Sequence, residues 1–378
     1  AAAGSNLVSV FRGYYGLSHN SGDTDYTGEL WFEHIASALD RWSDLSGINY
    51  VYEPNDDGAA FSNFASAAPG VVGTRGDVRI GGHNIDGNSG VLAYNFFPDN
   101  GEMVIDTNDS FYTNLSNDSL RFRNVVAHEA GHGLGFNHVE SNSSAFLMEP
   151  FLSTAFDGPQ LDDILASHQN FGDAFEFENG NETPATATSL GTILDGQTVS
   201  IGLDATDTVV ATTDIDFVSI DDDGDTDVFS FTVAAPSTID VAVTPQGPSY
   251  SQGPQGGSQS TYDAGNQSDL TVEILDANGS TVLASANAAG IGGAESVNGL
   301  SVASAGTYYA RITGAQNAVQ LYRLDVTANF DVAPSEVSLA PVGSVDLIEG
   351  DGGLVDYSFV VTRSGDTSNS ATIDWSVA

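Results

Sequence analysis

The 378-residue chain is predicted to fold as an α/β domain followed by all-β sandwich structure. Before about residue 175, segments with helical spacing alternate with short strand-like segments. After it, short runs rich in Thr, Val, Ser and Gly alternate apolar and polar residues, as antiparallel strands do. The chain is also too long for one ordinary core. We therefore expect domains at 1–175, 176–330 and 331–378.

Three helices are expected in the first domain. The first spans 29–45, where apolar residues recur at the spacing of one buried helix face: Trp31, Ile35, Leu39 and Trp42. A second is expected from about 118 to 135. A third, 161–172, begins with acidic residues that suit a helix N-terminus and stops at a glycine. Four segments between the first two helices are predicted as strands, namely INYVYE, DVRI, VLAYNF and MVID. Three helices on a mixed sheet follow from this pattern.

The second domain shows the alternation of a β-sandwich. The segments that carry it are DVFSFTVA, STIDVAVTP, DLTVEILD, TYYARITG and YRLDVTA. The stretch 177–189 before them is polar and rich in Thr, Pro and Gly, so we predict a linker there. A new set of strands begins at Asp331, and the chain ends in mid-pattern at Ala378. A third sandwich, cut short, is expected in this last part.

The charge balance narrows the range of partners. Nine arginines and no lysine stand against 51 acidic residues, for a formal charge of −42. Such a surface repels nucleic acid and anionic membranes, so neither is expected as a partner. It suits a saline or marine setting, where salt screens the repulsion between carboxylates. The alternative is an acidic surface with no adaptive meaning.

Other features bear on the compartment. The chain has no cysteine, which excludes disulfides and thiolate ligands. It has no run of 18 apolar residues, so no membrane span is expected. It begins at Ala1 without a signal peptide, as expected after removal of a leader or pro-segment. We expect a secreted bacterial protein and a monomer.

The motif HEAGHGLGFNH, from His128 to His138, contains the candidate metal ligands and the candidate general base. On a helix, His128 and His132 lie one turn apart on the same side, so both imidazoles can reach one metal ion. His138 supplies a third ligand, which leaves the open position that a hydrolytic zinc site needs. Glu129 lies next to the first ligand and can act as general base for a water molecule. Gly135 allows the chain to leave the helix abruptly.

The same residues have three alternatives to a catalytic zinc site. The motif should arise by chance with a probability on the order of 10⁻⁵ in such a chain, which disfavours ordinary core or surface histidines. A metal-free, inactive descendant would keep the same residues. A different HExxH enzyme, such as an aminopeptidase, usually takes a glutamate from a later helix as its third ligand. His138 argues against that last class.

Together with the following FLMEP, this motif resembles the metzincin metallopeptidases, in which a turn methionine, here Met148, lies under the zinc ligands. Astacin- and serralysin-like metzincins carry a tyrosine ligand two residues later. That position is Pro150 here, so LMEP resembles the matrixins, which include the matrix metalloproteases and bacterial relatives. The resemblance runs from about residue 28 to 172 and implies a zinc endopeptidase. It also implies that Phe151 and Leu152 form a wall of the substrate pocket.

The matrixin resemblance further implies a structural calcium ion. DGNSGVLAYNFFP (86–98) resembles the loop that wraps it, and VIDTND (104–109) resembles the strand that completes it. The ligands would be the side chains of Asp86, Asp106 and Asp109 and the carbonyls of Gly87, Ser89 and Val91. Hard oxygen ligands of this kind suit calcium. The alternative is a solvated acidic turn.

Two matrixin features are not matched. The second, structural zinc of matrixins is not expected, because Tyr94 and Val104 replace two of its histidines and only His83 remains. One zinc ion is therefore predicted. NLVSVFRGYYG (6–16) also matches poorly the strand with which a matrixin domain opens. One interpretation is that this strand was removed with a pro-segment.

The β-rich tail has resemblances of its own. DTDVFSFTV and the strands after it resemble the bacterial pre-peptidase C-terminal domain, a jelly-roll-like sandwich that binds collagen or other polymers in some relatives. Such domains also bind calcium through acids of the lead-in and of a DxD loop. The candidates here are Glu176, Glu178, Asn179, Asn181, Asp221, Asp223, Asp225 and Asp227. The carboxylates of the loop DDDGDTD repel one another unless a cation binds between them. The alternative is a solvated loop without a cation. The last stretch resembles the start of a Calx-β sandwich.

These observations favour a secreted zinc endopeptidase that hydrolyses extracellular proteins, with Glu129 as the base for a zinc-activated water. The tail would tether the enzyme to its substrate or to an extracellular polymer. The alternative is a calcium-stabilised adhesin or polymer-binding protein with a vestigial metal site. One zinc per chain together with chelator-sensitive cleavage of casein separates the two.

Overall fold

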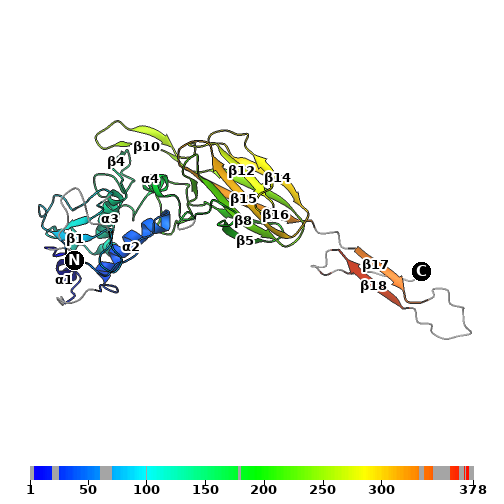
Figure 1. Ribbon diagram of the computed structural model, residues 1–378, viewed down its shortest axis with the longest axis horizontal. Coiled ribbons are helices and arrows are strands. Elements are labelled where there is room, and N and C mark those ends of the chain that lie inside the picture. The colour runs from blue at the N-terminus through cyan, green and yellow to red at the C-terminus, as the bar shows by residue number, and fades with distance from the viewer. Residues whose placement is uncertain are drawn as a thin grey trace, which may run out of the picture.

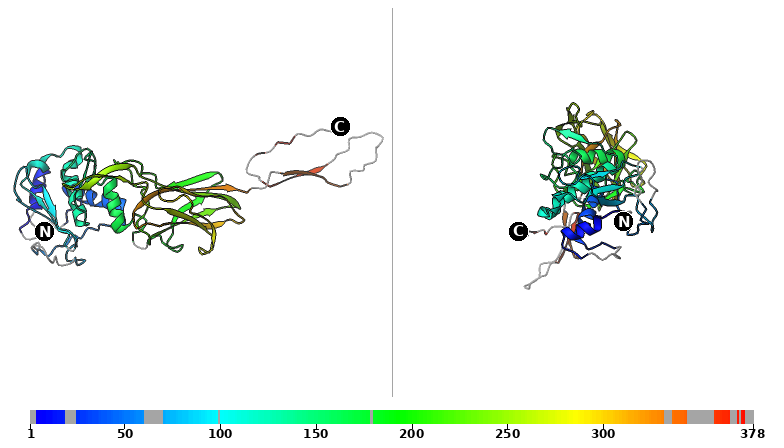
Figure 2. Two further views of the ribbon diagram at one scale, coloured as in Figure 1. Left: turned by 90° about the horizontal axis from the view of Figure 1, so that it is seen from above. Right: turned by 90° about the vertical axis from the view of Figure 1, so that its left-hand side faces the viewer.

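The structure is a computed structural model that describes residues 4–18, 25–59, 70–98, 100–177, 180–331, 336–343, 358–365, 370 and 372–373. Figure 1 shows a helix-containing N-terminal domain beside an elongated β-sandwich, and a two-stranded hairpin further along the chain. The two other views keep this order (Figure 2). Among the helices in the described ranges, none has the length and apolar character that a bilayer crossing needs.

The N-terminal domain combines a small mixed sheet with helices. Its strand order is β1-β3-β2, with β1 parallel and β2 antiparallel to β3. This confirms the predicted α/β class with a mixed sheet. Its elements are α1 (Leu7–Tyr14), α2 (Leu30–Leu45), β1 (Ile80–His83), β2 (Ala93–Asn95), β3 (Met103–Asp106), the 3-10 helix η1 (Ser110–Thr113), α3 (Ser116–Gly133), β4 (Val139–Ser141) and α4 (Leu161–Phe171).

Helix α2 supports the helix that carries the histidine motif. The predicted apolar stripe of α2 is confirmed: Trp31, Ile35 and Trp42 are buried in the domain core, and Leu39 is partly buried. The indole Nε1 of Trp42 donates a hydrogen bond of 3.0 Å to the carbonyl of Ala127 in α3. A buried polar group of this kind needs its partner, so the bond holds α3 at one position along α2.

Two parts of the N-terminal domain differ from expectation. Residues 7–14 form a fourth helix, because Leu7 and Phe11, one turn apart, are both buried, and the Phe11 ring lies 4.4 Å from that of Phe122. The predicted strand INYVYE (48–53) is absent from the described chain. There Val51 is 80% exposed, and Tyr52 instead packs edge-on against Phe32 with ring centroids 4.6 Å apart.

The second domain is a sandwich of two sheets. One has the order β13-β12-β15-β8-β5, and the other β14-β9-β16-β6, with β7 paired to β16. The five predicted strand segments are confirmed as β8, β9, β12, β15 and β16. The elements are β5 (Thr188–Ile193), β6 (Gln197–Ile201), β7 (Ser219–Ile220), β8 (Thr226–Val233), β9 (Ser237–Pro245), β10 (Ser249–Pro254), β11 (Ser260–Asp263), β12 (Leu270–Leu275), β13 (Val282–Ala286), β14 (Glu295–Val302), β15 (Gly306–Gly314) and β16 (Gln320–Phe330).

A hairpin of two strands follows the sandwich. β17 (Glu336–Pro341) pairs antiparallel with β18 (Phe359–Ser364). Within the described ranges, neither strand pairs with any other. Apolar side chains such as Leu339 and Val361 are exposed on it. A two-stranded ribbon buries too little apolar surface to be stable alone.

The N-terminal domain and the sandwich share a hydrophobic core. Leu45, Leu161, Ile164 and Leu165 from the helices pack with residues of the sandwich domain, which are Ala205, Val210, Phe217, Ala264, Val319 and Leu321. The buried side chain of His168 bonds across the same boundary to Ser219 of the sandwich domain, and also to Leu45 of its own domain. His168 Nε2 donates to the Leu45 carbonyl at 2.7 Å, and its Nδ1 lies 2.8 Å from Ser219 Oγ. Burial lowers the pKa of His168 to about 4, so the ring is neutral at this boundary.

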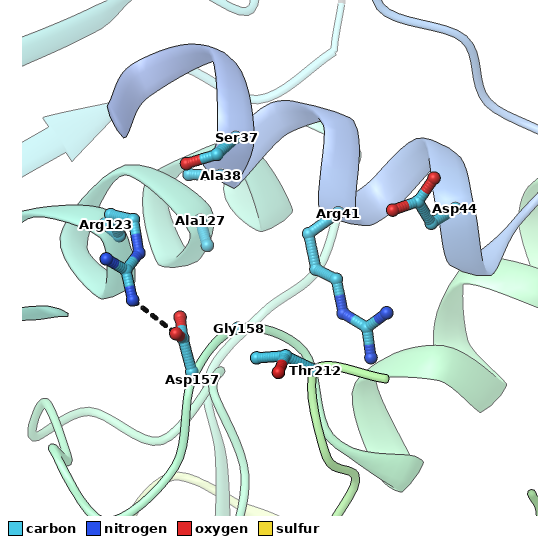
Figure 3. A pocket seen from close by; sticks show the side chains of 9 residues that line it. All are labelled: Ser37, Ala38, Arg41, Asp44, Arg123, Ala127, Asp157, Gly158 and Thr212. Atoms are coloured by element: carbon cyan, nitrogen blue, oxygen red, sulfur yellow. Dashed lines mark hydrogen bonds and ion pairs between the residues drawn. The ribbon is translucent and has the colours of Figure 1, made fainter. Parts of the chain in front are cut away.

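A small cavity of about 180 Å³ lies on the same boundary (Figure 3). Arg41 lies at its edge, and its Nη2 donates to the carbonyls of Ala211 and Asp214 in the sandwich domain, both at 2.9 Å. Across the cavity, Arg123 forms an ion pair with Asp157. These two arginines join α2 and α3 to the loops around them, and Thr212 is the one lining residue of the cavity that comes from the sandwich domain.

The shared core predicts that the two domains unfold together. Phe217 belongs to the sandwich domain and is 1% exposed, so Phe217→Ala should lower the free energy of unfolding by about 3–5 kcal/mol. The buried fluorophores Trp31 and Trp42 lie in the other domain. Their fluorescence should therefore change at a lower urea concentration in the variant. Val209→Ala, at a position that is 56% exposed, serves as control. An unshifted tryptophan transition in Phe217→Ala would contradict a shared core.

Candidate metal centre

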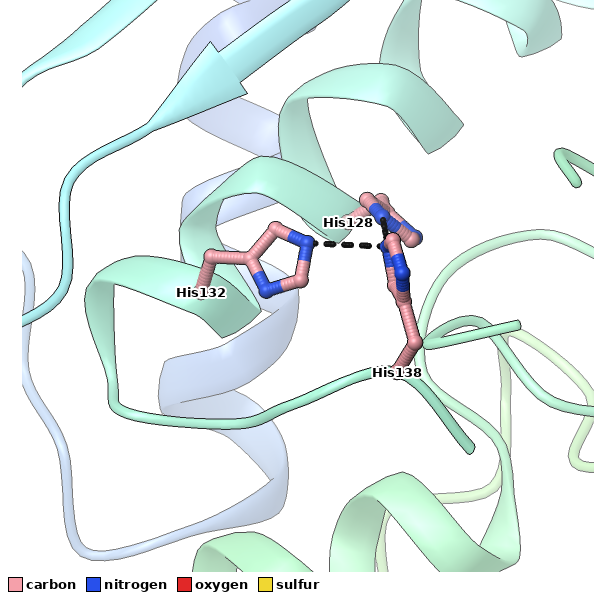
Figure 4. A group of neighbouring side chains, drawn as sticks. All are labelled: His128, His132 and His138. Carbon is pink, nitrogen blue, oxygen red and sulfur yellow. Dashed lines mark hydrogen bonds between the residues drawn. The ribbon is translucent and has the colours of Figure 1, made fainter. Parts of the chain in front are cut away.

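The three motif histidines converge on one point (Figure 4). His128 and His132 extend from α3, and His138 returns from the segment after the helix. The Nε2 atom of His138 lies 3.2 Å from that of His128 and 3.1 Å from that of His132. Among the described residues, these three form the one group of His, Asp or Glu side chains whose ligand atoms all lie within 4.8 Å of one another.

The return of His138 depends on how α3 ends. Gly135 has a φ of +103°, which a residue with a side chain rarely adopts. The Phe136 amide donates to the Gly131 carbonyl and the Gly135 amide to that of His132, both at 3.0 Å. This pair of bonds is the Schellman pattern of a helix end. The prediction that the chain leaves the helix at Gly135 is confirmed.

Each imidazole is held through its other nitrogen. Nδ1 lies 2.7 Å from the Leu147 carbonyl in His128, 2.7 Å from the Phe136 carbonyl in His132, and 2.9 Å from Gln255 Oε1 in His138. An acceptor at Nδ1 places the proton there and leaves the lone pair on Nε2. Burial also lowers the pKa of His128 to about 3 and lowers the pKa of His132. Three neutral imidazoles with facing lone pairs fit a zinc ion.

Met148 lies beneath this group. A Cβ atom built on Gly131, which stands between the two helical ligands, would lie 2.4 Å from Met148 Sδ. Only glycine therefore leaves room for the methionine. Met148 is 2% exposed and belongs to the core of the N-terminal domain. The predicted methionine turn thus packs directly against the metal-binding helix.

The methionine turn is in turn held by Asp163, a residue that sequence analysis did not single out. Its carboxylate accepts the amides of Leu147 at 2.8 Å and Met148 at 3.0 Å, and that of Gln160 at 2.8 Å. The first of these residues supplies the carbonyl that orients His128. The signal in the sequence was the capping box that Gln160 and Asp163 form at the start of α4. Nothing local shows that the same carboxylate reaches the turn.

Glu129 lies beside the histidines and lines the same cleft. It is 7% exposed, and burial raises its pKa to about 8. A dication beside it would favour the carboxylate form. Burial raises the pKa of such a carboxyl group and a nearby metal ion lowers it, so the group can exchange a proton near neutral pH. This is the property expected of a general base.

The cleft around the site has a volume of about 930 Å³. One side is strand β2 with the residues before it, and β2 is an edge strand paired only to β3 within the described chain. Pro150, Phe151 and Leu152, which follow Met148 in the chain, also line the cleft. Phe151 is 85% exposed. Pro254 and Gln255 of the sandwich domain also line the cleft, which sequence analysis did not foresee.

The segments of the expected calcium loop come together. The Gly87 amide donates to Asp106 Oδ2 at 2.8 Å, the Ser89 amide to Asp109 Oδ2 at 2.9 Å, and the Val91 amide to Asp86 at 3.1 Å. The loop 86–91 is therefore wrapped on the carboxylates of the 104–109 segment. In this arrangement the carboxylates are bonded to backbone amides.

A second acidic group lies where the sandwich begins. Asn181 and Asp227 are fully buried and bonded to each other at 2.7 Å, and Asp225 is 8% exposed. Burial raises the pKa of Asp227, and the nearby carboxyls of Asp173 and Glu176 raise it further; Asp173 was not among the predicted candidates. Two buried oxygens, Asn181 Oδ1 and Asp225 Oδ1, have no hydrogen-bond partner among the residues that the structure describes.

The remaining predicted members of this group lie elsewhere. Asp221 is partly buried and its amide donates to Asp225, whereas Asp223 is exposed to solvent. Glu178 and Asn179 lie outside the described residues. The buried carboxyls that remain repel one another, and burial followed by this repulsion raises the pKa of Glu176 to about 9.

Comparison with known families agrees with this geometry. Residues 14–172 match the Matrixin peptidase family model, and residues 225–314 match that of the bacterial pre-peptidase C-terminal domain. The chain carries a matrixin domain followed by a bacterial pre-peptidase C-terminal domain. The matrixin match contains the three histidines, Glu129 and Met148.

Two curated relatives cover the matrixin part. Karilysin from Tannerella forsythia is 31% identical over 174 residues, which are 44% of this chain and 34% of that protein. Hatching enzyme from Paracentrotus lividus is 29% identical over 127 residues, which are 32% of this chain and 18% of that protein. The chain thus spans about a third or less of these relatives.

One solved structure is similar to part of the chain. The pre-peptidase C-terminal domain of a collagenase from Bacillus anthracis is 18% identical and covers 37% of this chain and 93% of its own, with a TM-score of 0.21.

Because Gly131 and Met148 are in contact, the effects of substituting them on the free energy of unfolding should be strongly coupled. Gly131→Ala places a methyl group in the space of the sulfur atom and should destabilise the zinc-free protein by about 1–3 kcal/mol. The same change in a Met148→Ala background should cost less, because the space is then open. Urea unfolding of the four proteins in EDTA measures the difference. Equal costs in both backgrounds would show that the two residues do not compete for space.

Proposed function

We propose that this protein is a secreted zinc-dependent endopeptidase. The observation that carries the proposal is the convergence of three neutral imidazoles beside Glu129 in an open cleft of a matrixin domain. The match to the matrixin family, which implies an endopeptidase, supports cleavage within a polypeptide chain.

Each residue of the site has a role in peptide hydrolysis. His128, His132 and His138 would hold a zinc ion, which supplies Lewis acidity toward the scissile carbonyl and lowers the pKa of a water molecule. The Glu129 carboxylate accepts the proton of the attacking water and passes it to the nitrogen of the leaving amine. The Nδ1 acceptors fix the tautomer and the orientation of the three imidazoles.

The residues that line the cleft suggest a way in which a substrate binds. The free edge of β2 offers backbone groups to which an extended peptide adds as a further strand. Phe151 and Leu152 in the lining of the cleft present apolar surface to a substrate side chain. We therefore propose extended protein or peptide segments as substrates, with an apolar residue facing these two side chains.

Calcium is proposed at two places. The first is the loop 86–91, whose amides donate to Asp86, Asp106 and Asp109; the carbonyls of Gly87, Ser89 and Val91 would complete a set of hard oxygen ligands. The second place is the buried group at the start of the sandwich, where Asn181 Oδ1 and Asp225 Oδ1 lack partners. A buried carboxylate without a partner is costly, and a calcium ion would remove that cost. The carboxylates there do not converge as closely as the histidines do.

We also propose domain limits, an oligomeric state and a medium for this protein. We place the domain limits at 1–175, 176–330 and 331–378, with the last part Calx-β-like. The net charge of −42 supports a protein that works as a monomer in a saline extracellular medium, without nucleic acid as a partner. The sandwich domain would bind an extracellular polymer.

The role of Glu129 can be separated from metal binding. Glu129→Ala should lower the rate of casein cleavage by at least about 10²-fold, because the general base is lost. Zinc should stay at one per chain by elemental analysis, because the three imidazoles are intact. Glu33→Gln, at an exposed position of α2, should change neither. Cleavage at the normal rate by Glu129→Ala would exclude this mechanism.

The second calcium site predicts a pH-dependent stabilisation. The pKa is raised by burial to about 6 for Asp225, about 7 for Asp173 and about 9 for Glu176. Without calcium, the stability that these groups contribute is present at low pH and is lost as pH rises through these values. The rise in Tm that calcium causes should therefore grow from pH 5 to pH 9.

Matched variants identify the site behind this effect. Asp225→Asn should remove most of the growth in the calcium-dependent Tm shift, because a ligand charge is lost. Asp223→Asn, in the same loop but exposed, should retain it. Identical shifts in both variants would assign the effect to another site.

A further inference from the structure

A hairpin of the sandwich domain extends to the metal centre. Strands β10 and β11 pair with each other, and β10 also pairs antiparallel with β4, the strand that directly follows His138. The register places Pro254 opposite Val139 and Gly253 opposite Glu140. Figure 1 shows β10 reaching from the sandwich to the side of β4. The two domains thus share one three-stranded sheet next to the third metal ligand.

The base of this β10–β11 hairpin is anchored on the N-terminal domain. The hydroxyl of Tyr250 donates to Asp162 Oδ1 at 2.7 Å. Its ring packs edge-on against Phe146, two residues before Met148, with centroids 5.1 Å apart. These contacts fix the hairpin at the start of α4 and at the methionine turn.

The tip of the hairpin is a tight turn. The Gly257 amide donates to the Pro254 carbonyl at 2.8 Å, and Gly256 has a φ of +68°. A positive φ at the third position is the mark of a type II turn, which needs glycine there. The Gly256 amide donates to Glu140 Oε2 at 3.2 Å. The residue at the second position of the turn, Gln255, is therefore held from both sides.

Gln255 touches a metal ligand. Its Oε1 lies 2.9 Å from Nδ1 of His138, 117 residues away in the sequence. Since Nε2 of His138 faces the other two imidazoles, the proton belongs on Nδ1 and the amide oxygen accepts it. Main-chain carbonyls do this for His128 and His132. The third ligand takes its acceptor from the other domain.

We propose that Gln255 is a positioning residue of the metal centre, and that the β10–β11 hairpin makes the sandwich domain part of the active site. Gln255 fixes the tautomer and the orientation of the His138 ring through Nδ1. Together with Pro254 it also forms a part of the cleft wall that a substrate meets. The inference rests on the proposed zinc binding. It assigns the sandwich domain a role in the metal centre itself, beyond the tethering of a polymer.

Zinc affinity of the full chain tests the inference without any substrate. Gln255→Met keeps the length of the side chain and removes the acceptor, and it should weaken zinc binding about tenfold in competition with a fluorescent chelator. Gln255→Glu keeps an acceptor oxygen and should bind zinc as tightly as the parent chain or more so. Gln259→Met, in the same hairpin with its amide toward Ser251, should leave the affinity unchanged.

A spectroscopic readout separates positioning from a structural role. With Co²⁺ in place of zinc, Gln255→Met should shift the visible absorption bands, whereas Gln259→Met and Gln255→Glu should keep or closely approach the parent spectrum. The zinc-free forms of the variants should unfold at the same temperature, because Gln255 is exposed. Equal zinc affinities and equal Co²⁺ spectra for Gln255→Met and the parent would overturn the inference. A parent chain that binds no zinc would overturn the proposed function as well.

Discussion

The arrangement of the whole active site depends on where three Nδ1–H groups find an acceptor. An imidazole presents the Nε2 lone pair to a metal only if the proton is held on the opposite nitrogen. The three acceptors here are the carbonyls of Phe136 and Leu147 and the side chain of Gln255. They come from the end of the metal-binding helix, from the methionine turn and from the second domain. Each of these three segments must therefore be placed accurately for one site to form.

The supports of these segments run through the core. Asp163 holds the backbone of Leu147 and Met148, and Met148 fills the space that Gly131 leaves open on α3. The Trp42 indole fixes α3 from its other side. Because each support is buried, a change in any of them costs stability as well as ligand geometry. The stability of the domain and the geometry of the site thus depend on the same set of contacts.

The boundary between the two domains contains buried polar groups as well as apolar contacts. Neutral His168 and the guanidinium of Arg41 lie within it, and the acidic group around Asp173 and Asp225 lies at its edge. Buried groups of this kind need partners on both sides, so they fix the angle between the domains better than apolar packing alone. A fixed angle is what allows the hairpin tip to reach His138 with the accuracy of a hydrogen bond.

The sequence by itself determined the local chemistry. Helical spacing places His128 and His132 on one face, Gly135 ends the helix, and period-two alternation marks five strands of the sandwich, because all of these depend on near neighbours in the chain. Only the tertiary structure decided which distant groups complete the site. No local sequence pattern around Asp163, Asp173 or Gln255 indicates which residues they contact. Helix α1 is stabilised by the contact between the rings of Phe11 and Phe122, which are also far apart in the sequence. Contacts across tens or hundreds of residues depend on how the domains pack, and packing is set by the whole chain at once.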